Sequence, residues 1–282
     1  MLKQRIITAG VLAPLAIAAI FLLPLKLFSL LVAAIYLLAS REWGSLVAKD
    51  KRAYILYPFG FVLGASLIAI PIDGIWLSEL NPYVFGILSA GGIWWIACLL
   101  LVLGYPKSAR FWRQQPWLKA IFGLLTLMPF FWALVTLRGV NIFHDPTEGA
   151  WWVLFVMLLV WGADTGAYFS GKSLGRHKLA PQVSPGKTIE GFVGGLVTTI
   201  VIALIAVFAF EITSDKQVWF VLAAILTSLA SSLGDLSESM FKRQAGIKDS
   251  GRLLPGHGGV LDRIDSLTAA LPVFTLCYIA WL

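Results

Sequence analysis

The chain has 282 residues, of which 59% are hydrophobic and only 13% are charged, and this composition excludes a water-soluble globular protein of that length. The net charge of +7 does not point to nucleic acid, because the basic residues of a membrane protein mainly set its orientation and meet anionic lipid or phosphate. We therefore expect a polytopic membrane protein that binds membrane lipids and no nucleic acid.

Nine apolar runs are long enough, or nearly so, to cross the hydrocarbon core of a bilayer, which is about 30 Å thick. Because backbone in lipid must satisfy its own hydrogen bonds, these runs are expected to be helices and the fold class all-α. The second run is short, and an eight-span alternative follows if it merges with the first. The runs cover residues 6–25, 27–40, 54–72, 83–103, 117–137, 150–169, 191–210, 217–236 and 266–282.

The basic residues predict the orientation of these spans. With nine spans and a cytoplasmic N-terminus, all of the 22 Lys and Arg residues lie on the cytoplasmic side except Lys26, Arg138 and Lys216. The positive-inside rule favours this arrangement. It places two polar segments, 170–190 and 237–265, together on the cytoplasmic face, where nucleotides and Mg²⁺ are available.

The two halves of the chain differ in their content of chemically reactive side chains. Residues 1–138 are expected to form N-terminal transmembrane helices. We interpret Arg41, Glu42 and Trp43 as an interfacial anchor, and the alternative is a functional group. Residues 139–282 are expected to form a catalytic region that contains both polar segments. Here Asp164 lies inside an apolar run, where a carboxylate normally faces a polar cavity and a partner; the alternative is that it is hydrated at the cytoplasmic end of the span.

The segment SPGKT at 184–188 precedes the seventh run. Ser184 begins a turn that contains Pro and Gly, and Lys187 and Thr188 follow at the start of the next helix. Turn amides, an ammonium group and a hydroxyl at a helix N-terminus are suited to a phosphate. An ordinary capping turn has a similar sequence, so both interpretations stay open.

Carboxylates flank the second polar segment on both sides. Asp235 and Glu238 are three residues apart and share a helix face, and so do Asp262 and Asp265 at the entrance to the last run. Carboxylate oxygens are ligands that Mg²⁺ prefers. If the segment folds back between two helix ends on one membrane face, Asp235 and Asp262 can meet; the alternative is two capped helices with hydrated acids.

Three features favour a reaction site over hydrated helix ends. The turn PGHGG at 255–259 precedes Asp262 and offers backbone N–H groups to an anion. The segment 237–265 carries more cations than its acids need, and no separate soluble nucleotide-binding domain is apparent in the sequence. Acids for a metal and cations for phosphates at the lipid boundary indicate phosphoryl or nucleotidyl transfer onto a lipid.

The sequence SMFKRQAGIKDSGRLLPGHGGVLDRID at 239–265 resembles the signature of the phosphatidate cytidylyltransferases, or CDP-diacylglycerol synthases. The upstream sequences DTGAYFSGKSLGRHKL at 164–179 and SPGKTIEG at 184–191 are also similar to that family. The resemblance implies a nucleotidyltransferase of phospholipid biosynthesis that converts CTP and phosphatidate to CDP-diacylglycerol and diphosphate. It implies Mg²⁺, with a second metal ion left open, and a bacterial cytoplasmic (inner) membrane. A homodimer is also left open.

The resemblance also implies roles for particular residues. Asp235 and Asp262 match metal ligands of the family, and Asp265 is a further candidate. His257 either protonates or orients a phosphate, or packs the Gly-rich turn, and the sequence does not choose. The catalytic candidates are Asp235, Asp262, Lys248 and His257. The candidates for binding substrate or phosphate are Ser184, Lys187, Thr188, Lys242, Arg243, Lys248, Arg252 and Arg263.

Phosphatidate is a strong nucleophile when ionised, so we expect its phosphate oxygen to attack the α-phosphorus of CTP directly, without a covalent enzyme intermediate. Two alternatives remain. A CTP-dependent kinase of a polyprenol or other lipid alcohol would move the γ-phosphoryl group and would need a base for the hydroxyl. An ion-coupled transporter would explain Asp164, but it would not explain the many cations of 237–265.

Overall fold

The computed structural model describes residues 2–47, 52–76, 79–254, 256 and 258–282. Within these residues the helices are α1 (Leu2–Leu22), α2 (Leu25–Val47), α3 (Arg52–Ala69), α4 (Pro82–Leu103), α5 (Pro116–Arg138), α6 (Glu148–Leu174), α7 (Ile189–Ala209), α8 (Gln217–Ala245) and α9 (Leu261–Trp281). Two short 3₁₀-helices are η1 (Ile72–Gly74) and η2 (Lys107–Arg110). The strands β1 (Lys178–Ala180) and β2 (Ser184–Thr188) form an antiparallel hairpin.

Each apolar run of the sequence corresponds to one helix, so the all-α prediction is confirmed. Among the described residues, seven helices, α2 and α4 to α9, are long and apolar enough to cross a membrane. The described apolar parts of α1 and α3, Gly10–Leu22 and Ile55–Ala69, are shorter. The second run looked short in the sequence, but α2 continues to Val47 and has 23 residues, enough to span. The chain is therefore a polytopic α-helical membrane protein.

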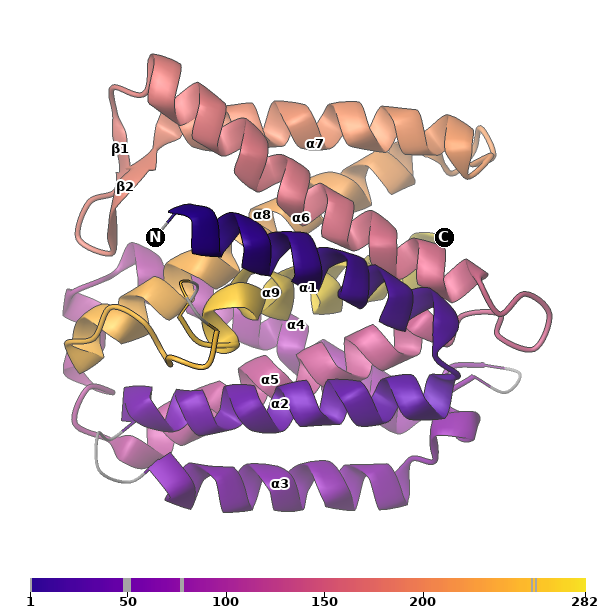
Figure 1. Cartoon of the computed structure of the whole chain (residues 1–282), viewed down its shortest axis with the longest axis horizontal. Helices are drawn as coiled ribbons and strands as arrows, with labels where there is room; N and C mark the ends of the chain where they lie inside the picture. Colours follow the sequence, from indigo (N-terminus) through magenta and orange to yellow (C-terminus); the bar gives the residue numbers. More distant parts are fainter. Residues whose placement is uncertain (1, 48–51, 77–78, 255, 257) are drawn as a thin grey trace.

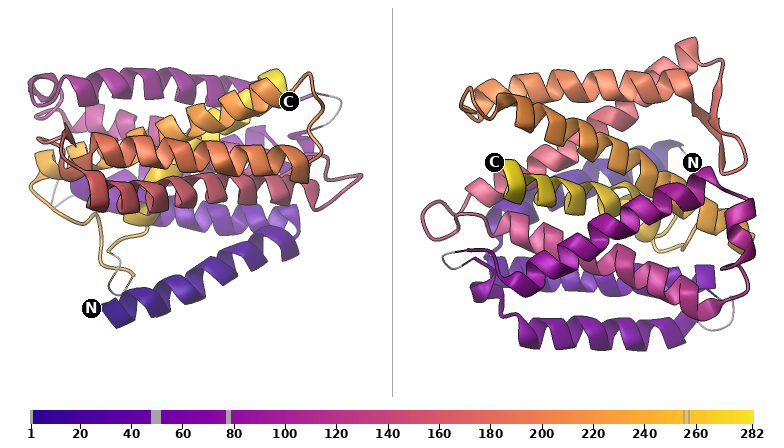
Figure 2. Two further views of the ribbon diagram at one scale, coloured as in Figure 1. Left: turned by 90° about the horizontal axis from the view of Figure 1, so that it is seen from above. Right: turned by 180° about the vertical axis from the view of Figure 1, so that it is seen from behind.

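The helices run back and forth along one axis, so that their connections lie at two ends of the molecule (Figure 1). The N-terminus, the β1–β2 hairpin and the loop 246–260 lie at one end, and the C-terminus lies at the other. α6 packs along α7, α8 packs along α9, and α5 contacts α2, α4 and α9. α1 lies at the edge and slants away from the other helices towards its N-terminus (Figure 2).

α5 is the most enclosed of the spanning helices. Phe131 and Trp132 are fully buried near its middle. At its end Arg138 is also buried, and its guanidinium donates to the carbonyl oxygens of Ile20 at 2.6 Å and Pro146 at 2.9 Å. Because the last carbonyl groups of a helix lack partners within it, Arg138 satisfies the end of α1 and ties that helix to α5.

Gly91 allows α4 and α5 to approach closely. A Cβ atom at this position would lie 2.5 Å from Cβ of Pro129 on α5. We expect Gly91→Ala to lower the free energy of unfolding by about 1–3 kcal/mol, because the added methyl group forces the helices apart. Thermal unfolding in detergent measures the change. Gly86→Ala is the control on the same helix, since a Cβ there has no atom within 4 Å. An equal loss in both variants would contradict this account.

The polar segments 170–190 and 237–265 are helical over more of their length than the sequence indicates. α6 extends past its predicted end, and α8 stays helical to Ala245. α8 continues beyond the apolar run because Phe241 is buried and packs on the ring of Trp43, with ring centres 5.3 Å apart. Several of the predicted site residues therefore sit on a rigid helix.

The reversal that the sequence places at Ser184 occurs earlier in the chain. Ser184 itself belongs to β2 and pairs with Ala180 of β1. Val183, just before β2, is buried, and Arg243 Nε on α8 donates to its carbonyl oxygen at 3.1 Å. Residues 181–183 form the turn of the hairpin, so the Pro and Gly that follow Ser184 lie in the returning strand.

Candidate active site

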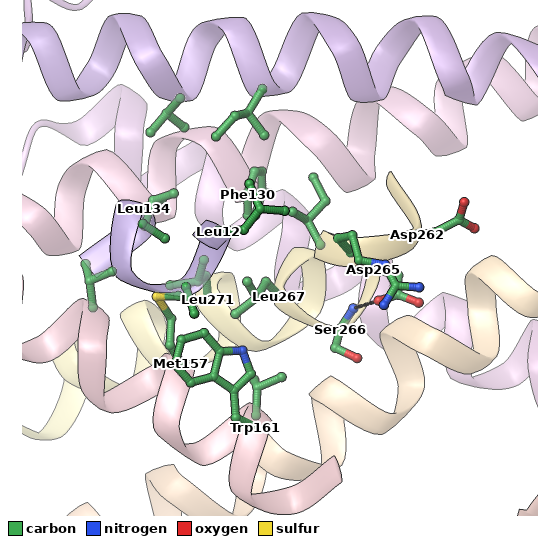
Figure 3. A pocket seen from close by; sticks show the side chains of 18 of the residues that line it. Leu12, Phe130, Leu134, Met157, Trp161, Asp262, Asp265, Ser266, Leu267 and Leu271 are labelled. Carbon is green, nitrogen blue, oxygen red and sulfur yellow. Dashed lines mark hydrogen bonds between the residues drawn. The ribbon is translucent and has the colours of Figure 1, made fainter. Parts of the chain in front are cut away.

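A cavity of about 850 Å³ opens between helices from both halves of the chain and has two chemically different ends. Figure 3 shows apolar side chains such as Leu134 and Met157 on one side and Asp262 and Asp265 on the other. The apolar end is lined from α1, α2, α5 and α6, and the polar end mainly from α8, α9 and the loop 246–260. A site of this shape can hold a molecule with an apolar body and a charged head.

Asp262, in the first turn of α9, accepts hydrogen bonds from two places in the loop 246–260. Its carboxylate accepts from the backbone N–H of Ser250 at 2.9 Å and of Gly259 at 2.8 Å. The Ser250 hydroxyl also donates to it, at 2.9 Å. Gly258 has a φ of 84°, a conformation that suits glycine and turns the chain back towards α9. Asp262 therefore holds two parts of the loop together, one at Ser250 and one at Gly259.

Lys242 on α8 bridges two carboxylates. Its Nζ lies 2.8 Å from Asp262 Oδ1 and 3.0 Å from Glu238 Oε2. The side chains of Glu238 and Asp262 are each only 4% exposed, so the ammonium group compensates charges that water scarcely reaches. The other oxygen of Glu238, Oε1, is also buried, and the Glu238 carboxyl group interacts with that of Asp265.

Asp235 on α8 pairs with Lys187 of β2, with 2.6 Å between Oδ2 and Nζ. Lys187 also lines a second cavity, of about 380 Å³, between α6, α7, α8 and the hairpin. Asp164 is exposed and lines both cavities, so its carboxylate faces polar space that water also reaches. The two cavities therefore adjoin at Asp164 on α6.

Three further predicted site residues, Ser184 and Thr188 of the SPGKT segment and Arg243 on α8, lie at or near the hairpin. Thr188 is the N-cap of α7 and accepts from the Gly191 N–H at 3.1 Å, which the capping interpretation predicts. Thr188 also lines the second cavity beside Lys187, which agrees with the phosphate interpretation. Ser184 is half-buried in β2. Arg243 holds the hairpin through the carbonyl bond described above and is not among the residues that line the two cavities.

The predicted residues of the loop 246–260 and of α9 separate into two groups. Arg263 and Asp265 line the large cavity, and the Asp265 carboxylate accepts from the Ser266 N–H at 2.8 Å. Lys248 and Arg252 are exposed in the loop, and neither of them lines one of the two cavities. His257 lies outside the described residues.

Glu42 on α2 contacts residues next to Asp262, so the interpretation as an interfacial anchor is wrong for it, and the alternative, a functional group, is the one that the contacts favour. Its Oε2 accepts from the backbone N–H of Leu261 at 2.8 Å and lies 3.4 Å from Ser250 Oγ. The neighbouring Trp43 is buried and does not face an interface. Leu261 is 219 positions away in the chain, so no local pattern indicates the contact. The one available signal was a carboxylate next to an apolar run, which needs a partner.

The polar end of the large cavity holds more acids than cations. No three His, Cys, Asp or Glu side chains in the described part of the chain are arranged as a metal-binding group. The donors nevertheless fit a hard cation such as Mg²⁺, because they are carboxylates that outnumber the cations beside them. The interacting acids are Asp164, Asp235, Glu238, Asp262 and Asp265, opposed by Lys187, Lys242 and Arg263.

The sequence pattern of the cytidylyltransferase family matches residues 3–281. The chain is 42% identical over 295 residues to the phosphatidate cytidylyltransferase of Haemophilus influenzae, with 99% of each chain covered. It is 44% identical over 274 residues to that of Pseudomonas aeruginosa, with 97% of this chain and 96% of the other covered. The protein of the same name from Staphylococcus saprophyticus is 34% identical over 284 residues, with 99% of each covered. The chain therefore belongs to the cytidylyltransferase family.

Proposed function

We propose that this protein is a phosphatidate cytidylyltransferase, which joins CTP and phosphatidate to form CDP-diacylglycerol and diphosphate. The two-ended cavity is the observation that carries the proposal, because acyl chains suit its apolar end and a phosphate suits Lys242 and Arg263 at the other. Relatives that match nearly the whole chain carry the same name.

The proposed reaction brings two polyanions together. A phosphatidate oxygen attacks the α-phosphorus of CTP in line, the bond from that phosphorus to the bridging oxygen of the β-phosphate breaks, and diphosphate leaves with the bonding electrons. Lys187, Lys242 and Arg263 line the adjoining cavities and would offset the charge of the approaching substrates and of the leaving group. Because phosphatidate is itself the nucleophile, no covalent enzyme intermediate is required.

Mg²⁺ is part of the proposal. Asp235 and Asp262 would hold the ion, and Asp265 is a further candidate ligand because its carboxylate lines the same cavity. Bound there, the ion supplies positive charge next to the phosphates. The same carboxylates hold Lys187 and Lys242, which keeps both ammonium groups close to the substrates' expected position.

We place the polar end of the cavity at the cytoplasmic face of the bacterial inner membrane. The hairpin and the loop 246–260 belong to the polar segments 170–190 and 237–265, which carry nine of the 22 Lys and Arg residues, and both lie at the same end of the molecule as the N-terminus (Figure 1). The positive-inside rule assigns such an end to the cytoplasm. CTP reaches the site from that side.

Turnover by the detergent-solubilised protein with CTP, phosphatidate and Mg²⁺ tests the proposed function. We expect lipid-linked CMP and free diphosphate in equal amounts. A kinase would instead release CDP and phosphorylate a lipid alcohol, and a transporter would show no turnover of CTP; either result would contradict the proposal. Recovery of nucleotide-labelled protein after incubation with CTP alone would contradict direct displacement.

Ala16 on α1 lines the apolar end of the cavity, whereas its neighbour Leu15 is 59% exposed. We expect Ala16→Trp to raise the KM for a long-chain phosphatidate by about tenfold, because the ring displaces one or two methylene groups worth about 0.8 kcal/mol each. The KM for CTP should not change. Leu15→Trp is the matched control on the same helix. A similar rise in both variants, or in neither, would argue against an acyl chain at this end.

A further inference from the structure

The N-terminus of α9 takes its cap from a distant part of the chain. Val260 occupies the N-cap position and offers no side-chain hydrogen bond there. The first backbone N–H groups of a helix have no partner within it. Glu42 Oε2 accepts from the Leu261 N–H at 2.8 Å, and a negative charge is favourable at the positive end of a helix dipole. A carboxylate of α2 thus stabilises the start of the helix that carries Asp262.

Two glycines of the loop make room for Glu42. A Cβ atom on Gly251 or on Gly259 would lie 2.6 Å from Cδ of Glu42, and the three nearest atoms at each position all belong to Glu42. Neither glycine is among those with a positive φ. It is therefore the Glu42 carboxylate, and not the backbone conformation, that makes an added side chain unfavourable at these positions.

Ser250 lies between Glu42 and Asp262. Its hydroxyl lies 2.9 Å from Asp262 Oδ2 and 3.4 Å from Glu42 Oε2. Its carbonyl oxygen accepts from the hydroxyl of Ser45 on α2, at 3.0 Å. α2 therefore holds the loop at two points: Ser45 binds Ser250, and Glu42 binds the N–H of Leu261 at the start of α9.

The end of α2 that carries Glu42 is itself fixed to α5. Trp43 Nε1 donates to the carbonyl oxygen of Lys119 at 2.8 Å, and Lys119 Nζ donates to that of Val47 at 2.7 Å. The Trp43 ring covers Gly123 of α5, where a Cβ atom would lie 2.6 Å from Cδ1 of the ring. Glu42 thus extends from a rigid support into the loop.

We infer that Glu42 is a positioning residue for the transfer reaction. It holds the loop 246–260 against α9 so that Asp262 and Lys242 keep their mutual geometry. The inference rests on the proposed function, but its structural part concerns the order of the loop in the protein alone. A failure of this inference can be distinguished from a failure of the proposed function, because the order of the loop can be measured without any substrate.

Hydrogen–deuterium exchange of the full-length, substrate-free protein in detergent tests the structural part. We expect Glu42→Ala to increase exchange in peptides from 248–262 by about tenfold or more, since a hydrogen bond to a charged group is lost, with α5 unchanged. Glu42→Gln keeps an oxygen acceptor and should stay within roughly threefold of wild type. Arg41→Ala, at an exposed neighbouring position, is the control. Unchanged loop exchange in Glu42→Ala, or an equal increase in α5, would overturn the inference.

Turnover tests the positioning role, with Gly251→Ala as a second way to disturb the same contact. We expect Glu42→Ala to lower kcat by about tenfold or more while the KM for CTP changes little, and Glu42→Gln to recover most of the loss. Gly251→Ala should lower kcat similarly, because its methyl group displaces the carboxylate. The double variant Glu42→Ala with Gly251→Ala should be no worse than Glu42→Ala alone. Losses that multiply in the double variant would show that the two groups act separately and would refute the role.

Discussion

Asp262→Asn is expected to lower kcat by about a thousandfold while the helices stay folded. The groups that face the carboxylate are hydrogen-bond donors, namely Lys242 Nζ, the N–H and hydroxyl of Ser250 and the N–H of Gly259. An asparagine has a single oxygen acceptor, and its NH₂ group would face donors in place of the second oxygen. The substitution also removes a negative charge from the proposed Mg²⁺ site.

The assay scores lipid-linked CMP and diphosphate separately, and circular dichroism with size-exclusion chromatography checks that the variant is folded. Asp215→Asn is the matched control, because Asp215 is an exposed acid in the connection between α7 and α8, at the opposite end of the molecule from the loop 246–260 (Figure 1). We expect this variant to behave as wild type. A folded Asp262→Asn protein with turnover within tenfold of wild type would remove Asp262 from the proposed site.

Lys242→Met is expected to abolish most activity and to destabilise the protein as well. The substitution leaves the carboxylates of Glu238 and Asp262 buried without their shared cation, which costs about 3–5 kcal/mol in comparable buried pairs. For a protein of this size the thermal midpoint should fall by roughly 5–10 °C. The cation proposed to meet the phosphates is lost at the same time, so kcat should fall by about a hundredfold or more.

A second substitution separates the two effects of losing Lys242. Glu238→Gln removes one of the two uncompensated charges, so the double variant Glu238→Gln with Lys242→Met should regain part of the thermal midpoint and none of the activity. Lys107→Met, which changes an exposed lysine of η2, is the control for loss of a cation. Activity that returns together with stability in the double variant would mean that Lys242 acts on folding alone.

The sequence predicted the helices well because a long apolar run in lipid has one common way to satisfy its backbone groups. It also predicted that Asp235 and Asp262 lie at one site, and both line the large cavity. Their meeting at a metal ion stays a prediction, since each holds a different lysine. The boundaries were less accurate, because the burial of Phe241 that keeps α8 helical depends on a tryptophan of another helix.

By itself, the sequence determined the all-α membrane class, the approximate spans and the segments that carry the site residues, because hydropathy and charge are properties of each segment alone. Only the tertiary structure decided which group each acid contacts: Lys187 for Asp235, Lys242 for Asp262, and the N-terminus of α9 for Glu42. The last of these contacts joins positions 219 residues apart. Local sequence around Glu42 is equally compatible with an interfacial anchor, and only the packing of α2 against α5 and the loop 246–260 brings its carboxylate to α9.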